Sequence, residues 1–290
     1  MIFAILKITR IRRIHKLSNA KLEKEAMHVL KETSRTFYIP ITLLKRQLKL
    51  TVGSAYLCMR AIDEIEDHDT MDADIKESLL RETKQLLLEE GAFNKDAYAR
   101  MVQPYESDLP EVTIRLGDWL DICPDGIVRK VREATAEMAG GMADWVKKDW
   151  VIETKEDLDN YTYYVAGLVG VMLSDIWKWY DGTETDYDLA IGFGRGLQAV
   201  NILRNQHEDF AERGVRFIPE GWTRDDVFDY ARENLDLAKQ YMKDIKTRNI
   251  YLFCKIPLAL AERTLKAMED GREKMSRQEV EEVVEKIKSE

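Results

Sequence analysis

The sequence predicts an all-α fold, with one domain built as a helical bundle around a central cavity. Only 15 glycines and 6 prolines occur in 290 residues, and so few helix breakers favour long helices. Apolar residues recur with helical spacing, and no segment alternates as a half-buried strand does. Because no repeat and no Gly-, Ser- or Pro-rich linker is present, we expect a single domain over residues 19–290, preceded by a separate basic amphipathic segment, residues 1–18.

Breakers and caps mark the helices of the first half. Pro40 should end the first helix, Asp72 should cap the third, and Gly91 should stop it. Pro110 and Pro124 should bracket a short helix. The expected helices are residues 19–37, 41–67, 72–90 and 94–108, a short one between 110 and 124, and 126–148.

Caps also mark the second half. Thr154 is a typical N-cap, with Glu156 and Asp157 in the first turn of the helix that follows it. The segment GVRFIPEGW, residues 214–222, should be a loop. The expected helices are residues 154–180, 185–211, 223–248, 250–270 and 276–288.

Composition excludes several classes of function. Lys and Arg total 44 against 53 Asp and Glu, so a net charge of −9 argues against nucleic acid as a partner. The acidic excess would instead suit the recruitment of cations. Cys58, Cys123 and Cys254 lack metal-ligand spacing and indicate reduced core thiols in a cytoplasmic protein, and the four scattered histidines disfavour a zinc site.

The first sixteen residues, MIFAILKITRIRRIHK, are apolar and basic. Their apolar run is too short for a signal peptide, and no stretch of the sequence is long enough to predict a transmembrane helix. One interpretation is a helix on an anionic membrane surface, which would make the cytoplasmic protein membrane-associated. The other is an ordinary first helix or a lead-in to it.

A polar stripe in AYLCMRAIDEIED predicts chemistry. Tyr56, Arg60, Asp63 and Asp67 follow i, i+4, i+7 and i+11, so they share one face of a helix. Two carboxylates one turn apart can hold a hard cation such as Mg²⁺, and an arginine one turn away can bind a diphosphate oxygen. The alternative is a solvated acidic face.

A second stripe lies in QAVNILRNQHED. Gln198, Asn201, Asn205 and Asp209 follow i, i+3, i+7 and i+11 in a helix whose other side is apolar. Buried amides are costly unless they are paired, so the stripe indicates either a polar cavity or a hydrogen-bond ladder between helices. Two such helices facing each other could hold metal ions between them.

Three further segments are less specific. In YTYYVAGLVG, Tyr161, Val165 and Leu168 share a face, and the glycines would admit a neighbouring helix or a hydrocarbon chain. TSRTF could present the Ser34 hydroxyl and the Arg35 cation. The run GFGRG is not a dinucleotide loop, because its spacing is GxGxG and no strand precedes it.

These segments resemble the squalene/phytoene synthase family, the head-to-head trans-prenyl synthases. TSRTF, AYLCMRAIDEIED, YTYYVAGLVG and LQAVNILRNQHED followed by RGVRFIP match its motifs in order, and the resemblance extends over residues 33–280. It implies an all-α isoprenoid-synthase fold with a large cavity, Mg²⁺, a place in isoprenoid biosynthesis, and farnesyl diphosphate or a longer prenyl diphosphate as substrate.

The resemblance also assigns roles to residues of this chain. Asp63, Asp67, Asn201 and Asp209 are the implied metal ligands, and Tyr161 matches a tyrosine credited with a catalytic role. An apolar channel for the prenyl tail would be lined partly by Val165 and Leu168. The positions implied to contact substrate are Ser34, Arg35, Phe37, Tyr56, Arg60, Val165, Leu168, Gln198, Asn201 and Asn205.

One position departs from the family pattern. Asn205 stands where the second motif has its first aspartate, and the loss of a ligand charge should weaken cation binding there. A branch of the family that is similar around NILRN releases farnesol from farnesyl diphosphate, so the leading expectation is a phosphatase-like hydrolase: ionisation of farnesyl diphosphate followed by water capture. One alternative is a transferase that couples two farnesyl diphosphates to a presqualene-, dehydrosqualene- or squalene-type product, although the sequence contains no recognisable NADPH site. The other alternative is a non-catalytic helical interaction protein.

Overall fold

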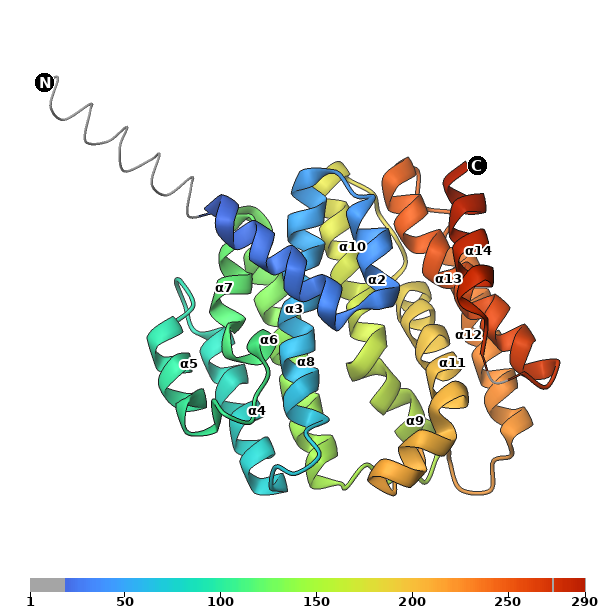
Figure 1. Ribbon diagram of the computed structural model, residues 1–290, viewed down its shortest axis with the longest axis horizontal. Coiled ribbons are helices and arrows are strands. Elements are labelled where there is room, and N and C mark those ends of the chain that lie inside the picture. The colour runs from blue at the N-terminus through green and yellow to red at the C-terminus, as the bar shows by residue number, and fades with distance from the viewer. Residues whose placement is uncertain (1–18, 273, 290) are drawn as a thin grey trace, which may run out of the picture.

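The computed structural model describes residues 19–272 and 274–289, and this part of the chain contains helices and no β-strand (Figure 1). Residues 19–33 are helical. The following elements are α2 (Arg35–Thr42), α3 (Arg46–Glu66), α4 (Ala73–Leu88), α5 (Lys95–Val102), the 3₁₀ turn η1 (Gln103–Tyr105), α6 (Glu111–Ile114), α7 (Leu116–Asp121), α8 (Asp125–Lys147), α9 (Lys155–Thr162), the π-helical turn η2 (Tyr163–Gly167), α10 (Leu168–Asp181), α11 (Tyr187–Arg213), α12 (Arg224–Tyr241), α13 (Arg248–Glu269) and α14 (Arg277–Ser289).

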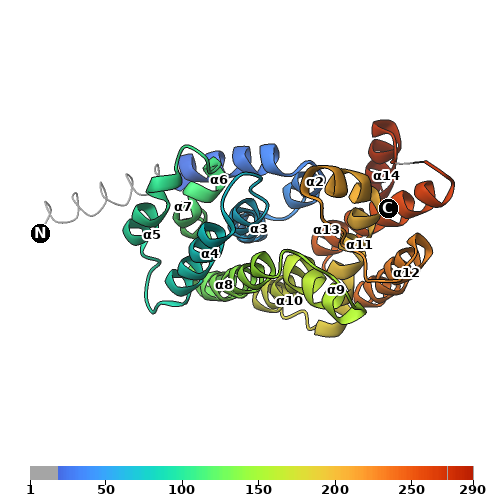
Figure 2. The same cartoon turned by 90° about the horizontal axis from the view of Figure 1, so that it is seen from below.

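Helix α3 runs through the middle of one half of the bundle. Residues 19–33 and α2 lie on one side of it, and α8 and α10 lie on the other (Figure 2). Most side chains of α3 are buried, including Leu57, Ile62 and Ile65 at 0% exposure. The residues of the first stripe lie on a less buried face of this helix, where Tyr56, Arg60 and Asp63 are half-buried.

Helices α11, α12, α13 and α14 make up the other half of the bundle (Figure 2). The segment η2–α10 joins the halves, because α10 contacts both α3 and α11 and η2 contacts α11. One hydrophobic core runs through both halves, from Ala26 to Met268, and a smaller cluster packs α14 against α13.

Glycines allow η2–α10 and α11 to approach closely. A Cβ atom on Gly170 would collide with the carbonyl of Ala190, and one on Gly194 would collide with the carbonyl of Ala166. The glycines of YTYYVAGLVG therefore admit a neighbouring helix, which is the first of the two expectations. Gly194 belongs to GFGRG, so this run lies in α11 and allows α11 to pack closely against η2.

Several boundaries differ from the expectations. Pro40 lies inside the short helix α2 and does not end the preceding helix, which stops at residue 33, where the N-cap Ser34 starts α2 instead. The helix expected over 154–180 is interrupted by η2, where the hydrogen bonding widens to a π turn. The helix expected over 223–248 ends at Tyr241, after a capping box between Thr223 and Asp226 at its start.

The expected basic segment, residues 1–18, lies outside the described residues. None of the described helices combines the length and the apolar composition that crossing a membrane requires. All three cysteines are buried and unpaired with one another. Membrane association and a cytoplasmic location remain predictions.

Candidate active site

Three carboxylates meet at the C-terminal end of α3. One oxygen each of Asp63, Glu66 and Asp67 lies within 4.8 Å of the others. Asp63 and Asp67 are half-buried, and Glu66 is buried at 1% exposure. The prediction that Asp63 and Asp67 lie together is confirmed, and Glu66, which lies close to the predicted stripe at three residues from Asp63, joins them.

Glu66 is held by residues from two other parts of the chain. The indole N–H of Trp150 donates to Glu66 Oε1, and Lys76 Nζ of α4 donates to the Glu66 backbone carbonyl at 2.9 Å. Lys76 also lies 5.3 Å from the centre of the Trp150 ring. Trp150 and its neighbour Asp149 both have left-handed backbone, with φ of 51° and 55°, which non-glycine residues rarely adopt. Backbone strain of this kind often accompanies functional sites.

Arg60 is paired along the same helix. Its Nη1 bonds Asp63 Oδ2 at 2.5 Å, and its Nη2 bonds Glu64 Oε1 at 2.6 Å. Burial, followed by the negative charge of Asp67, raises the pKa of Asp63, while Arg60 opposes that rise. The structure therefore concentrates negative charge at the end of α3, with one arginine partly compensating it.

The donor set fits a hard divalent cation. Mg²⁺ prefers oxygen ligands and is often held by one or two carboxylates together with substrate phosphates. The charge of Asp67 adds to the burial that raises the pKa of Asp63, so the like charges of these two carboxylates oppose each other. A divalent cation between them would turn that repulsion into attraction. Asp63, Glu66 and Asp67 are the residues that could hold it.

The TSRTF segment lies against α3 close to Arg60. Tyr56 donates its hydroxyl to the backbone carbonyl of Thr33 at 3.0 Å, and its ring lies 6.3 Å from that of Phe37. Ser34 is the N-cap of α2, because its hydroxyl accepts from the N–H of Phe37 at 3.0 Å. This bond directs the Ser34 hydroxyl towards the helix backbone. The side chain of Arg35 lies outside the described part of the chain.

The second stripe lies on α11 as a row of half-buried amides. Asn201 Nδ2 lies 3.5 Å from Gln198 Oε1, at the limit of a hydrogen bond, and Asn205 Oδ1 accepts from Arg204 Nε at 3.1 Å. Asp209 belongs to α11, but its side chain is outside the described residues. That this helix supplies metal ligands therefore stays a prediction.

Tyr161 is buried at 4% exposure in an aromatic column. The edge of Trp145 meets its ring at 5.5 Å, and Phe217 stacks on it at 4.8 Å with an interplanar angle of 18°. Val165 is half-buried, and Leu168 belongs to the core at 3% exposure. The partners of Tyr161 come from positions distant in the sequence, and no local pattern pointed to them.

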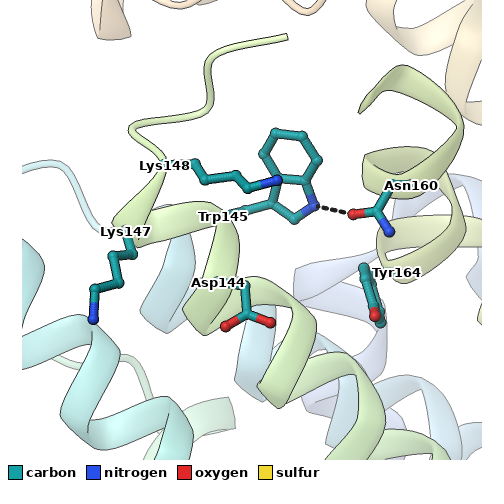
Figure 3. Close-up of a pocket in the computed structure, with 6 residues that line it drawn as sticks. All are labelled: Asp144, Trp145, Lys147, Lys148, Asn160 and Tyr164. Carbon is teal, nitrogen blue, oxygen red and sulfur yellow. Dashed lines mark hydrogen bonds between the residues drawn. The ribbon is translucent and has the colours of Figure 1, made fainter. Parts of the chain in front are cut away.

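A cavity of about 350 Å³ opens beside Trp145 (Figure 3). It lies between the end of α8 and the α9–η2 segment, and it contains none of the site residues predicted from the sequence. Trp145 both lines this cavity and packs on Tyr161, so one ring separates the two. The lining residues are Asp144, Trp145, Lys147, Lys148, Asn160 and Tyr164.

The described part of the chain is an all-α bundle with three carboxylates at the end of α3 and a row of amides on α11, which the glycine-containing segment η2–α10 contacts. Comparison with known proteins identifies the family. The model of the squalene/phytoene synthase family matches residues 30–228, and this chain belongs to that family.

Several relatives of this chain are squalene synthases. The chain is 30% identical over 281 residues to the squalene synthase of Schizosaccharomyces pombe, covering 84% of this chain and 59% of that protein. It is 28% identical over 271 residues to the squalene synthase of Dictyostelium discoideum, covering 82% and 62%. The chain thus spans about three fifths of the length of these relatives.

Solved structures confirm the fold. TcSQS in complex with a ligand superposes with a TM-score of 0.74 at 20% identity, covering 91% of this chain and 86% of that one. A dehydrosqualene synthase in complex with a ligand gives 0.62 at 20% identity, covering 94% and 97%. The expected all-α isoprenoid-synthase fold is confirmed. These relatives favour the coupling alternative, and they do not support the leading expectation of farnesol release.

Proposed function

We propose that this chain is an Mg²⁺-dependent transferase that couples two molecules of farnesyl diphosphate, or of a longer prenyl diphosphate, head to head. The observation that carries the proposal is the cluster of Asp63, Glu66 and Asp67 in a chain that the family model matches over residues 30–228. The squalene synthases of the comparison favour coupling over hydrolysis. Three carboxylates within 4.8 Å of one another favour a bound cation over the non-catalytic alternative.

The residues of the chain divide the work between binding and orientation. Asp63, Glu66 and Asp67 would hold the cation, which supplies Lewis-acid neutralisation of the leaving diphosphate. Arg60, already between Asp63 and Glu64, would add charge-assisted hydrogen bonds to the diphosphate. Tyr56 holds the TSRTF segment against α3 through its bond to Thr33, and Arg35 of this segment is the first residue of α2. On α11, Asn201 and Asp209 would complete the cation ligands.

Ionisation of the allylic C–O bond needs no covalent nucleophile. The diphosphate leaves with the bonding electron pair, and preorganised charge around it supplies most of the rate. Tyr161 would then lie near the allylic cation, within its aromatic column. The first coupled product would be of the presqualene type.

Product analysis tests the proposal directly. The full chain is incubated with farnesyl diphosphate and MgCl₂. Any diphosphate group still attached to a product is then removed, and the organic products are identified by gas chromatography and mass spectrometry. A coupled product that disappears when EDTA is added is the expected result. Unchanged farnesyl diphosphate, with and without Mg²⁺, would contradict the proposal.

Release of farnesol remains a second candidate because of Asn205. Its amide carries no charge, and its Oδ1 already accepts from Arg204. If this residue determines the fate of the cation, Asn205→Asp should raise the coupled fraction of the product several-fold, since ligand charge strengthens cation binding. Gln206→Glu adds the same charge one residue further along α11 and serves as the control. Identical product spectra for Asn205→Asp and the parent would show that Asn205 does not determine the product.

A further inference from the structure

Phe217 is the buried anchor of the loop that follows α11. In residues 214–222, Arg216, Glu220 and Gly221 are exposed, whereas Phe217 is only 6% exposed. The loop begins and ends at glycines with left-handed backbone, Gly214 at φ 69° and Gly221 at φ 77°. Phe217 is therefore the buried aromatic residue of this loop, and it packs on the core together with Val215 and Ile218.

The ring on which Phe217 rests is that of Tyr161. The two rings stack at 4.8 Å with 18° between their planes, and neither residue is more than 6% exposed. One face of Tyr161 is thus covered by a residue of a surface loop.

A second ring packs on Tyr161 from a helix. Trp145 belongs to the long helix α8, is 1% exposed, and donates its indole N–H to Asn160 Oδ1 at 3.1 Å (Figure 3). Lys148 lies 4.9 Å from the centre of its ring. Of the two rings that pack on Tyr161 in the described structure, Phe217 is the one that belongs to a loop.

The loop itself is tied to the segment before α9. The N–H of Glu220 donates to the backbone carbonyl of Glu153 at 3.0 Å, and the N–H of Trp222 donates to the carbonyl of Pro219 at 3.1 Å. Trp222 packs on Tyr230 of α12, with ring centres 5.9 Å apart. The loop thus has two aromatic anchors, of which only Phe217 covers Tyr161.

We propose that Phe217 is a positioning residue that seals the Tyr161 side of the reaction centre against water and so determines how much of the product is coupled and how much is farnesol. The inference rests on the proposed function, in which an allylic cation forms near Tyr161. Exclusion of water is what protects a reactive intermediate from hydrolysis in a closed site.

Coupling and hydrolysis of the cation both balance with farnesyl diphosphate and water as the only reactants. In coupling, the C2–C3 double bond of the second farnesyl diphosphate donates its electrons to C1 of the cation, and loss of a proton to the departed diphosphate closes a cyclopropane. In hydrolysis, a water oxygen bonds to C1 and loses its proton to the same diphosphate, which gives farnesol. A single sealing ring can thus change the product without changing the first step.

The test measures the partition between products. The parent chain, Phe217→Ala and Phe217→Leu are incubated with farnesyl diphosphate and Mg²⁺ in water enriched in oxygen-18, and farnesol and coupled product are quantified by mass spectrometry. Water capture at C1 labels the farnesol oxygen, whereas cleavage of the P–O bond by a contaminating phosphatase does not. Trp222→Ala is the matched control, since it removes the other aromatic anchor of the same loop.

Phe217→Ala should raise the ratio of labelled farnesol to coupled product on the order of tenfold, because the cover over Tyr161 is lost. Phe217→Leu keeps an apolar cover and should stay near the parent ratio, as should Trp222→Ala. If Phe217→Ala does not fold, Phe217→Ser and Phe217→Val are compared in its place, and the smaller and more polar Ser should give the larger ratio.

The outcomes separate the two proposals. An active Phe217→Ala variant with the parent ratio, or a Trp222→Ala variant with an equal shift, overturns the sealing role and leaves the proposed function standing. A parent chain that consumes no farnesyl diphosphate overturns the proposed function, and the sealing role falls with it.

Discussion

The two polar helices of this protein differ in how they carry charge. At the end of α3, Asp63, Glu66 and Asp67 lie within 4.8 Å of one another, and residues from α4 and from the segment after α8 hold the middle one. Along α11, the described side chains of the second stripe are the amides of Gln198, Asn201 and Asn205, spread over two turns. One helix end is a dense anionic cluster, and the described stripe of the other helix consists of amides.

The difference indicates an asymmetric division of labour. Cation affinity depends strongly on ligand charge, so α3 should supply most of the binding, and α11 should orient what is bound. Because the halves are joined through η2 and α10, the geometry between them depends on close backbone packing more than on side-chain bonds. The predictions below test this asymmetry.

The largest effect should come from the anionic cluster. Asp63→Asn removes a ligand charge with little change of shape, and Mg²⁺-dependent release of diphosphate from farnesyl diphosphate should fall on the order of 10²–10³-fold. Asp144→Asn removes the carboxylate that pairs with Arg81 on the surface and should leave the rate unchanged. Activity of Asp63→Asn within threefold of the parent, about 0.7 kcal/mol, would remove α3 from its central role.

The next effect concerns the join between the halves. In Gly194→Ala the new methyl group would meet the Ala166 backbone carbonyl, which cannot move without shifting η2, so the free energy of unfolding should fall by about 1–3 kcal/mol. Gly53→Ala, in α3 with nothing within 4 Å of the new atom, should instead be stabilising by roughly 0.5–1 kcal/mol. Urea denaturation measures both, and equal effects would contradict the close packing.

A smaller effect should follow from loosening Glu66. Trp150→Phe keeps an aromatic ring but removes the N–H that donates to Glu66 Oε1. The Mg²⁺ concentration needed for half-maximal activity should rise by about tenfold, the lower end of what loss of a partner to a metal ligand costs. In Trp119→Phe, an indole N–H that donates to the backbone carbonyl of Val112 is lost instead, and the Mg²⁺ requirement should not change. Matched shifts in both variants would indicate general destabilisation.

The smallest effect is a pH dependence. Burial and the charge of Asp67 raise the pKa of Asp63 in the folded protein. At pH values between the usual carboxyl pKa of about 4 and this raised pKa, the folded protein therefore binds a proton at Asp63 that the unfolded chain does not. The metal-free protein should therefore lose stability as the pH rises through this range, and stabilisation by Mg²⁺ should grow. Melting temperatures with and without Mg²⁺ across this range measure the difference. A stabilisation that is independent of pH, or one that persists unchanged in Asp63→Asn, would contradict the assignment.

The sequence predicted most helices and two of the three carboxylates of the anionic cluster, since both depend on local spacing. Helix α8 lies within one residue of its expected bounds, and Asp63 and Asp67 share a face as expected. Glu66 lies close to the same stripe, at i+3 from Asp63, but the spacing alone did not single it out as a member of the cluster.

Other features depend on contacts that no local pattern records. Trp150 reaches Glu66 across 84 residues, from a left-handed backbone that its sequence does not mark. The stacking of Phe217 on Tyr161 likewise needs the packing of a loop on a distant helix. The local pattern predicts regular helix over residues 163–167, but these residues form the π turn η2, which packs against α11. Tertiary packing thus overrides the local helical pattern there.

The most direct measurement is a crystal structure with Mn²⁺ and an unreactive thiodiphosphate analogue of farnesyl diphosphate, in which anomalous scattering locates the metal. The account predicts a Mn²⁺ peak between Asp63, Glu66 and Asp67, in contact with the diphosphate, and a farnesyl chain that reaches towards Tyr161. A diphosphate bound elsewhere, with no peak at the three carboxylates, would contradict it.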